Sequence, residues 1–229
     1  FIQMLPSPAL AASADLWISG YLNSWDLNMV GAGGGCDPGP LPNDKIDFTA
    51  MTHIIMFAAC PNSSGIIQYN NLLACKRKPF NDYVHNNSDI PVILSLGGST
   101  CSSFSSAISP ANRAAFVNDV IATLRREEYD GIDMDIESGI NQADLNAVSA
   151  DLYNAFQNEH AYYDTTKKPQ LLAAGMGSGS NWAPVAQYYD QINIMSYDMQ
   201  GDWISQTWHN NAVYATATDL SRNATSIND

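Results

Sequence analysis

Hydrophobic and polar positions alternate most regularly between residues 129 and 137, which read Tyr-Asp-Gly-Ile-Asp-Met-Asp-Ile-Glu. The apolar residues fall at every second position: Ile132, Met134 and Ile136. The acidic residues fall between and after them: Asp133, Asp135 and Glu137. Because side chains in a strand have a period of two, the pattern predicts a strand with one apolar face and one acidic face. The apolar face and the preceding glycine favour a buried strand over the alternative, an acidic edge strand with a wet face.

Other apolar runs and helical stripes surround this stretch. Strands are predicted over residues 16–21, 52–59, 91–96, 171–176 and 191–199. Helices are predicted from Ser109-Pro110 to residue 124 and over 142–159, with shorter ones over 181–189 and 80–85. The residues from 61 to 89 otherwise read as a long polar loop. The repeated alternation of strand and helix predicts a parallel sheet closed as a barrel.

Three carboxylates on one face of a strand are an unusual way to build a core. Each negative charge disfavours ionisation of the next, so protons are shared and some pKa values rise. A carboxyl group with a raised pKa is suited to general acid catalysis near neutral pH. The stretch is therefore the first candidate for an active site.

The five fixed residues of the pattern Asp-Gly-x-Asp-x-Asp-x-Glu are all present: Asp130, Gly131, Asp133, Asp135 and Glu137. This pattern resembles the signature of family-18 glycoside hydrolases, the chitinases and their relatives. The resemblance implies an α/β fold, the eight-stranded TIM barrel, with this stretch as its fourth strand. It also implies that Glu137 protonates the glycosidic oxygen. Active sites of such barrels lie at the carboxyl ends of the strands.

Two further segments resemble the same family. Residues 95–98, Ser-Leu-Gly-Gly, are similar to its Ser-x-Gly-Gly motif, which shapes the floor of the substrate cleft. Residues 195–198, Met-Ser-Tyr-Asp, are similar to its Met-x-Tyr-Asp motif, in which the tyrosine contacts the reacting sugar. The residues expected to bind substrate are Tyr21, Ser95, Gly97, Gly98, Met176, Met195, Asp198 and Trp203.

The resemblance implies a secreted, endo-acting chitinase that needs no metal or other cofactor. Glu137 would be the acid and base, Asp135 would hold the acetamido group of the sugar, Asp133 would share a proton with Asp135, and Tyr197 would donate to the acetamido oxygen. The substrate would be chitin or a chito-oligosaccharide. Two alternatives remain open: an endo-β-N-acetylglucosaminidase acting on N-glycans, and a non-catalytic lectin on the same barrel. Lectin relatives typically lose the terminal acid, which is present here as Glu137.

The charge of the chain excludes several kinds of partner. The 229 residues carry a net charge of −13. This balance argues against nucleic acid and anionic membrane surfaces, which require Lys and Arg at the contact. No apolar run approaches the roughly 18 residues of a membrane span. A neutral polysaccharide is compatible with the composition, and a monomer is expected.

The cysteines and the N-glycosylation sequons are relevant to whether the protein is secreted. The four cysteines, Cys36, Cys60, Cys75 and Cys101, are expected in loops and permit two disulfides in any of three connectivities. A zinc site is the rival interpretation, but no C-x-x-C spacing supports it. Sequons for N-glycosylation begin at Asn62, Asn86 and Asn223.

The domain boundaries follow from these elements. Residues 1–14 resemble the remnant of a signal peptide, or else form a flexible N-terminus, and secretion is expected. Residues 15–229 are expected to form the catalytic barrel. Only six strands are readable, whereas a closed barrel of this kind needs eight. The sequence is therefore expected to be a truncated copy of a longer protein, cut after strand six.

Overall fold

A computed structural model describes residues 16–24, 46–69, 74–137, 139, 141–175, 181–202 and 207–212. Within this part of the chain, six parallel strands form one curved sheet in the order β1-β2-β4-β5-β6-β7, and the short β3 pairs antiparallel with β2. The strands are β1 (Ser19–Asn23), β2 (His53–Pro61), β3 (Ile67–Gln68), β4 (Val92–Gly97), β5 (Gly131–Asp135), β6 (Gln170–Gly175) and β7 (Gln191–Ile194).

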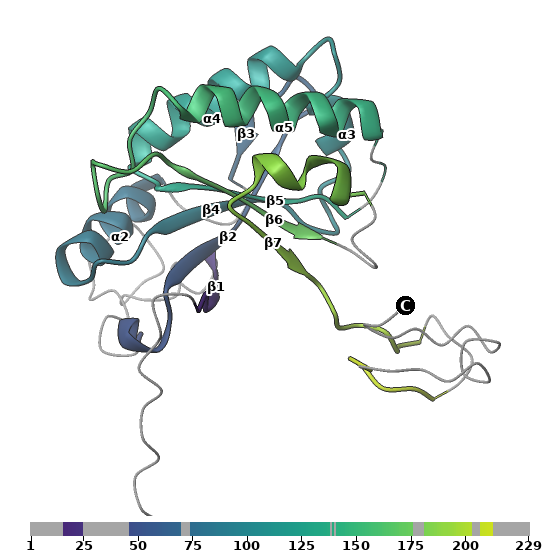
Figure 1. Cartoon of the computed structure of the whole chain (residues 1–229), viewed down its shortest axis with the longest axis horizontal. Helices are drawn as coiled ribbons and strands as arrows, with labels where there is room; N and C mark the ends of the chain where they lie inside the picture. The colour runs from purple at the N-terminus through teal and green to yellow at the C-terminus, as the bar shows by residue number, and fades with distance from the viewer. Residues whose placement is uncertain are drawn as a thin grey trace, which may run out of the picture.

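Helices connect the parallel strands. They are α2 (Ala74–Asn87), α3 (Phe104–Ala107), α4 (Arg113–Glu127) and α5 (Gln142–Phe156), with 3₁₀ helices η1 (Phe48–Ala50) and η2 (Ala183–Tyr188). Helices α4 and α5 lie together over one face of the sheet (Figure 1). Parallel neighbours joined through helices are the arrangement of a β/α barrel, and the described strands form a partial barrel of six. The predicted fold class is confirmed to that extent.

The core lies between the sheet and these helices. The apolar face of β5, Ile132 and Met134, is completely buried. Helices α4 and α5 supply the stripes expected from the sequence: Phe116, Val120, Leu124, Leu145, Val148, Leu152 and Phe156. Burying one such side chain stabilises the fold by about 1.5–3 kcal/mol. The outer layer therefore fixes the apolar side of β5 and leaves its acidic side facing the barrel interior.

Two expectations about helices were wrong. The helix predicted from Ser109 begins at Arg113, because residues 109–112 form a turn in which the Ser109 hydroxyl donates to the Ser106 carbonyl at 2.7 Å. The helix predicted over 80–85 is present but much longer than expected: it is part of the 14-residue helix α2, which also takes in residues expected in a loop and has Pro79 inside it. Tertiary contacts stabilise α2, since Phe80 and Val84 are fully buried and the Asn81 amide donates to the Glu127 carbonyl at 2.8 Å.

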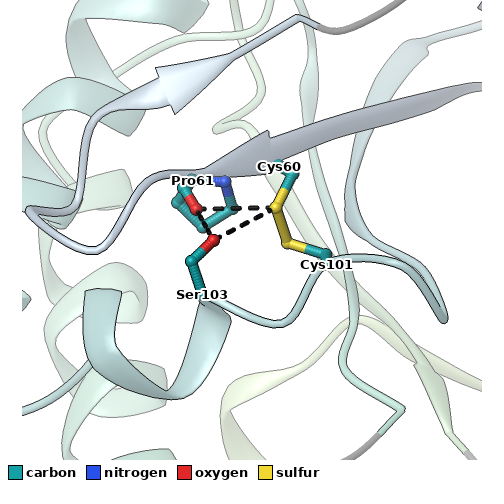
Figure 2. The surroundings of a disulfide bond; sticks show 4 residues. All are labelled: Cys60, Pro61, Cys101 and Ser103. Carbon is teal, nitrogen blue, oxygen red and sulfur yellow. Dashed lines mark hydrogen bonds between the residues drawn. A yellow bond between two sulfur atoms is a disulfide. The ribbon is translucent and has the colours of Figure 1, made fainter.

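The cysteines are not all in loops, as had been expected. Cys60 lies near the end of β2 and forms a disulfide with Cys101, which follows β4 (Figure 2). Ser103 donates a hydrogen bond to the Pro61 carbonyl beside it. Cys75 lies in α2 and is also disulfide-bonded. The disulfide therefore links the carboxyl ends of two neighbouring strands; Cys36 lies outside the described residues.

The sequons lie in different local structures. Asn62 is exposed in the turn between β2 and β3, where its side-chain oxygen accepts from the amides of Ser64 and Ile66 at 3.0 Å each. Asn86 is exposed in the last turn of α2. Asn223 and residues 1–14 lie outside the described part. Among the described helices, none is long and apolar enough to cross a membrane.

Candidate active site

Asp133 lies at the centre of β5 and faces the barrel interior. Register places it opposite Ser95 on β4 and Leu172 on β6. It is fully buried, and its Oδ2 atom accepts hydrogen bonds from the Tyr21 hydroxyl at 3.1 Å and the Ser95 hydroxyl at 3.0 Å. Burial raises the pKa of Asp133 to about 6, although both hydrogen bonds act in the opposite direction. Its Oδ1 atom has no hydrogen-bond partner among the described residues.

Asp135 follows on the same face, at the carboxyl end of β5. It is 4% exposed, and its Oδ1 atom also lacks a partner among the described residues. Burial raises the pKa of Asp135 to about 7, with further increases from the charges of Asp133 and Glu137. Two neighbouring carboxyl groups that both resist ionisation titrate as a pair. The pair therefore retains a proton close to neutral pH.

Glycines at the end of β4 allow close contact with β5. Gly97 has φ +133°, and a β-carbon there would lie 1.8 Å from the Asp135 carbonyl oxygen. The amide of Gly98 donates to the same oxygen at 2.9 Å. This close approach of the two strands holds the backbone of Asp135 in place.

A pocket of about 310 Å³ opens at this end of the sheet. It is lined by Tyr21, Asn23, Phe57, Asp135, Glu137, Ala174, Asn193, Ile194, Met195 and Tyr197. Glu137 lies two residues beyond β5 and is half-buried. Tyr197 follows β7 and is 53% exposed, and its pKa is raised by burial and by the nearby charge of Asp135. The pocket therefore brings together the accessible carboxyl group of Glu137, one member of the buried carboxyl pair, Asp135, and two tyrosines.

The predicted site residues divide into three groups. Those that line the pocket or support it from beneath are Tyr21, Ser95, Gly97, Gly98, Asp133, Asp135, Glu137, Met195 and Tyr197. Asp198 is exposed and does not line the pocket; its amide donates instead to the side chain of Asn210 at 3.2 Å. Met176 and Trp203 lie outside the described residues.

Sequence reasoning missed several wall residues: Asn23, Phe57, Ala174, Asn193 and Ile194. The two-residue period was a usable signal for some of them. Asn23 is two positions from Tyr21, and Asn193 is two positions from Met195. Phe57 is found only through the register that pairs it with Asn23.

Asp130 has a different role from the other acids of its motif. It is buried at the amino end of β5, where Oδ2 accepts from the Val92 amide and from Nε2 of His85, both at 2.7 Å. Its Oδ1 accepts from the amides of Tyr162 at 2.6 Å and Tyr163 at 2.9 Å. Asp130 thus joins β4, β5, α2 and the loop before β6, far from the pocket. Within the described ranges, no group of three His, Cys, Asp or Glu residues is placed to hold a metal ion.

The family model described as glycosyl hydrolases family 18 matches residues 18–228. The chain belongs to this family. The resemblance inferred from the sequence is confirmed, and the six described strands are the corresponding part of the family barrel.

Relatives of this family-18 chain include both oviduct-specific glycoproteins and chitinases. The oviduct-specific glycoprotein of Homo sapiens is 29% identical over 216 residues, covering 83% of this chain and 31% of the human protein. A class V chitinase of Lotus japonicus is 28% identical over 194 residues, covering 77% of this chain and 49% of the plant protein. The chain thus spans 31% of the length of one of these relatives and 49% of the other.

Solved structures show the same fold. The structure of a family-18 chitinase from Cycas revoluta, in complex with (GlcNAc)4, matches with a TM-score of 0.68 at 17% identity. The match covers 90% of this chain and 62% of the solved chain.

Proposed function

We propose that this family-18 chain hydrolyses β-1,4-linked N-acetylglucosamine polymers with retention of configuration, acting within the chain of chitin or chito-oligosaccharides. The observation that supports this most directly is the pocket itself, which half-buried Glu137 and Asp135 both line, while fully buried Asp133 lies next to Asp135 on the same face of β5. The Cycas revoluta relative holding four linked GlcNAc residues supports a substrate of the same chemistry.

The positions of the acids favour substrate-assisted catalysis. All three carboxyl groups come from β5 and the residues just after it, so they lie on one side of a bound sugar. A separate carboxylate nucleophile does not line the described pocket. Family 18 is a known exception to the two-carboxylate scheme, in which the acetamido group of the substrate is the nucleophile.

Glu137 donates its proton to the leaving oxygen. The acetamido oxygen attacks the anomeric carbon as the glycosidic bond breaks, giving a positively charged oxazolinium. Asp135 binds the acetamido N–H and stabilises this charge, while Tyr197 donates to the acetamido oxygen. Glu137, now a carboxylate, takes a proton from the water that opens the oxazolinium, so the enzyme returns to its initial state. No metal takes part in these steps.

The Asp133–Asp135 pair supplies the negative charge that stabilises the oxazolinium in these reaction steps. Their pKa values of about 6 and 7 leave the pair partly protonated when substrate arrives. The hydroxyls of Tyr21 and Ser95 both donate to Asp133. These hydrogen bonds stabilise a negative charge on Asp133 while the carboxyl group of Asp135 binds the sugar.

A second candidate is a non-catalytic carbohydrate-binding protein, because several relatives are named as oviduct-specific glycoproteins rather than as enzymes. The intact Glu137 favours hydrolysis over this alternative. An endo-β-N-acetylglucosaminidase acting on N-glycans is the third candidate.

The disulfide between Cys60 and Cys101 supports secretion, since such bonds persist in oxidising compartments.

Glu137→Gln tests the proposal. The variant keeps the shape and hydrogen bonding of the side chain but has no proton to donate, so turnover of chito-oligosaccharides is expected to fall at least about 10²–10⁴-fold. Oligosaccharide binding, measured by calorimetry, is expected to persist. Comparing product profiles on chito-oligosaccharides and on glycan-bearing proteins separates the three candidates. Near-normal turnover by the variant would show that Glu137 is not the acid.

A further inference from the structure

The parallel ladder between β2 and β4 stops before β2 ends. In the described part of the chain, its last residue pair is Ala59 with Leu96. Cys60, the next residue of β2, pairs instead with the short antiparallel strand β3. Beyond the ladder, the disulfide between Cys60 and Cys101 joins the two strand ends, with the α-carbons 5.6 Å apart (Figure 2). A covalent bond therefore replaces ladder hydrogen bonds at the end of the sheet where the pocket opens.

Ser103 provides a second connection at the same place. Its hydroxyl donates to the Pro61 carbonyl at 2.5 Å, and its Oγ atom lies 3.5 Å from the Cys60 sulfur. The segment after β4 is thus held to the end of β2 by one covalent bond and one hydrogen bond. Both cysteines of the disulfide are half-buried, so a small reductant can reach the bond.

The turn between β4 and Cys101 needs such an anchor because of its composition. It begins with Gly97 and Gly98, at φ +133° and +92°, and continues with exposed Ser99 and Thr100. Glycine loses more conformational freedom on folding than any other residue. The Cys101 amide donates to the Gly98 carbonyl at 2.9 Å, so a restraint on Cys101 also restrains Gly98.

Gly98 lies between two residues of the pocket wall. Its amide donates to the Asp135 carbonyl at 2.9 Å. A β-carbon added to Gly98 would lie 3.0 Å from Cζ of Phe57 and 3.8 Å from Oδ2 of Asp135, and both of these residues line the pocket. Phe57 is three residues before Cys60, and Gly98 is three residues before Cys101. The disulfide therefore closes directly behind the contacts that bring β2, β4 and β5 together at the pocket.

We propose that Cys60 and Cys101 are positioning residues, whose disulfide holds Gly98 against the Phe57 ring on one side and the Asp135 backbone on the other. Without the disulfide, the glycine turn regains conformational freedom and both contacts loosen, while the ladder at the amino ends of β2 and β4 remains. The catalytic meaning of this restraint rests on the proposed function, whereas the restraint itself is measured without substrate.

The experiment must separate this local effect from a general loss of stability, because a disulfide also stabilises a fold by restraining the unfolded chain. Amide hydrogen exchange makes the distinction. The amides of Gly98 and Cys101 report on the turn. The Ile54 amide donates to the Pro91 carbonyl at 3.1 Å, at the amino end of the same strand pair, and is the internal reference. A lower global stability alone does not reduce protection of the turn relative to Ile54.

Cys60→Ala/Cys101→Ala is compared with the unsubstituted protein by NMR. The protection factors of the amides at positions 98 and 101, relative to that of Ile54, are expected to fall at least about tenfold. Leu152→Ala is the control, since it truncates a fully buried side chain on α5 and lowers global stability away from the turn. Unchanged relative protection in the double variant, or an equal fall in Leu152→Ala, would overturn the proposal.

Reduction gives a second test if the double variant does not fold. Cys75→Ala lacks the disulfide of that residue, so Cys60–Cys101 is the bond among the described cysteines that a dithiol can open. Two electrons and two protons pass from the dithiol to this bond, which becomes two thiols, while the dithiol closes to a cyclic disulfide. The same loss of relative protection, reversed on reoxidation, is expected. Unchanged protection after alkylation shows the bond to be open would count against the proposal.

Activity separates the positioning role from the proposed function. If the unsubstituted protein hydrolyses chito-oligosaccharides, kcat/KM of the double variant should fall at least about tenfold more than that of Leu152→Ala, at a temperature where both are folded. Equal values would overturn the role of the disulfide in the site but not the proposed function. An unsubstituted protein without activity would refute the proposed function, and the exchange result would still decide whether the disulfide restrains the turn.

Discussion

Asp130→Asn is expected to destabilise the fold strongly, although it changes only an oxygen to an NH₂ group. The carboxylate is completely buried and accepts four hydrogen bonds, two on each oxygen. Three of the donors are backbone amides, from Val92, Tyr162 and Tyr163, and cannot reverse their role. Whichever way the new amide is oriented, its NH₂ group faces at least one backbone N–H, so two of the four bonds are lost or compromised.

The magnitude follows from that count. Hydrogen bonds to charged groups contribute about 1.5–3 kcal/mol each, so losing two is expected to lower the free energy of unfolding by about 3–6 kcal/mol. That is a large part of the roughly 5–15 kcal/mol that stabilises a typical domain. The effect should be on stability first, because Asp130 does not line the pocket.

Urea denaturation followed by circular dichroism measures this effect. Asp151→Asn is the matched control, since it makes the same chemical change in the exposed ion pair of Asp151 with Arg113 at 2.7 Å. An exposed pair contributes only about 0–1 kcal/mol. A loss below about 1 kcal/mol for Asp130→Asn, or equal losses for both variants, would refute the structural role given to Asp130.

Two other substitutions test the site. Asp135→Asn should lower turnover far more than Asp151→Asn. It should also flatten the pH dependence of stability: burial raises the Asp135 pKa to about 7, so its stabilising contribution is present at low pH and is lost as the pH rises through that value. If the free energy of unfolding, measured from pH 4 to pH 8, changes equally with pH in Asp135→Asn and in the unsubstituted protein, this expectation is contradicted. Gly97→Ala should destabilise by about 3 kcal/mol or more, because its β-carbon would lie 1.8 Å from the Asp135 carbonyl. Gly139→Ala, with φ +68° but no atom closer than 3.9 Å to the added carbon, controls for backbone strain alone.

The alternation of residues 132–136 was enough to predict which side chains of β5 are buried against the helices and which face the interior. Ile132 and Met134 lie in the core, and Asp133 and Asp135 lie together on the other face. This succeeded because a strand has a fixed period of two and each face of β5 meets a different environment. The other strands were predicted from apolar runs: β2, β4 and β6 lie within two residues of the predicted bounds, whereas β7 ends at Ile194, five residues before the predicted end.

What could not be predicted depends on contacts between distant residues. Helix α2 is polar in composition and contains Pro79, and only its packing against α4 shows why it is helical. The bond from Tyr21 to Asp133 joins residues 112 positions apart, and no local pattern indicates it. The wall residue Phe57 likewise reaches the pocket through strand register alone. Sequence periodicity identifies which face of a strand or helix a side chain lies on. Which residues it contacts across the sheet is known only from the folded structure.

The contrast between Asp130 and its two neighbours shows how one strand uses the same residue type for opposite purposes. Asp130 accepts hydrogen bonds from four donors, two on each carboxylate oxygen. A buried carboxylate that is hydrogen-bonded in this way can connect the elements around it. Asp133 and Asp135 each keep one buried oxygen without a partner among the described residues, and burial raises the pKa of both. An under-satisfied buried carboxyl group costs stability and retains a proton, which is of use only if a substrate later supplies the missing contact. The number of donors, rather than the identity of the residue, therefore separates the acid that holds β5 in place from the acids that we expect to act on the sugar.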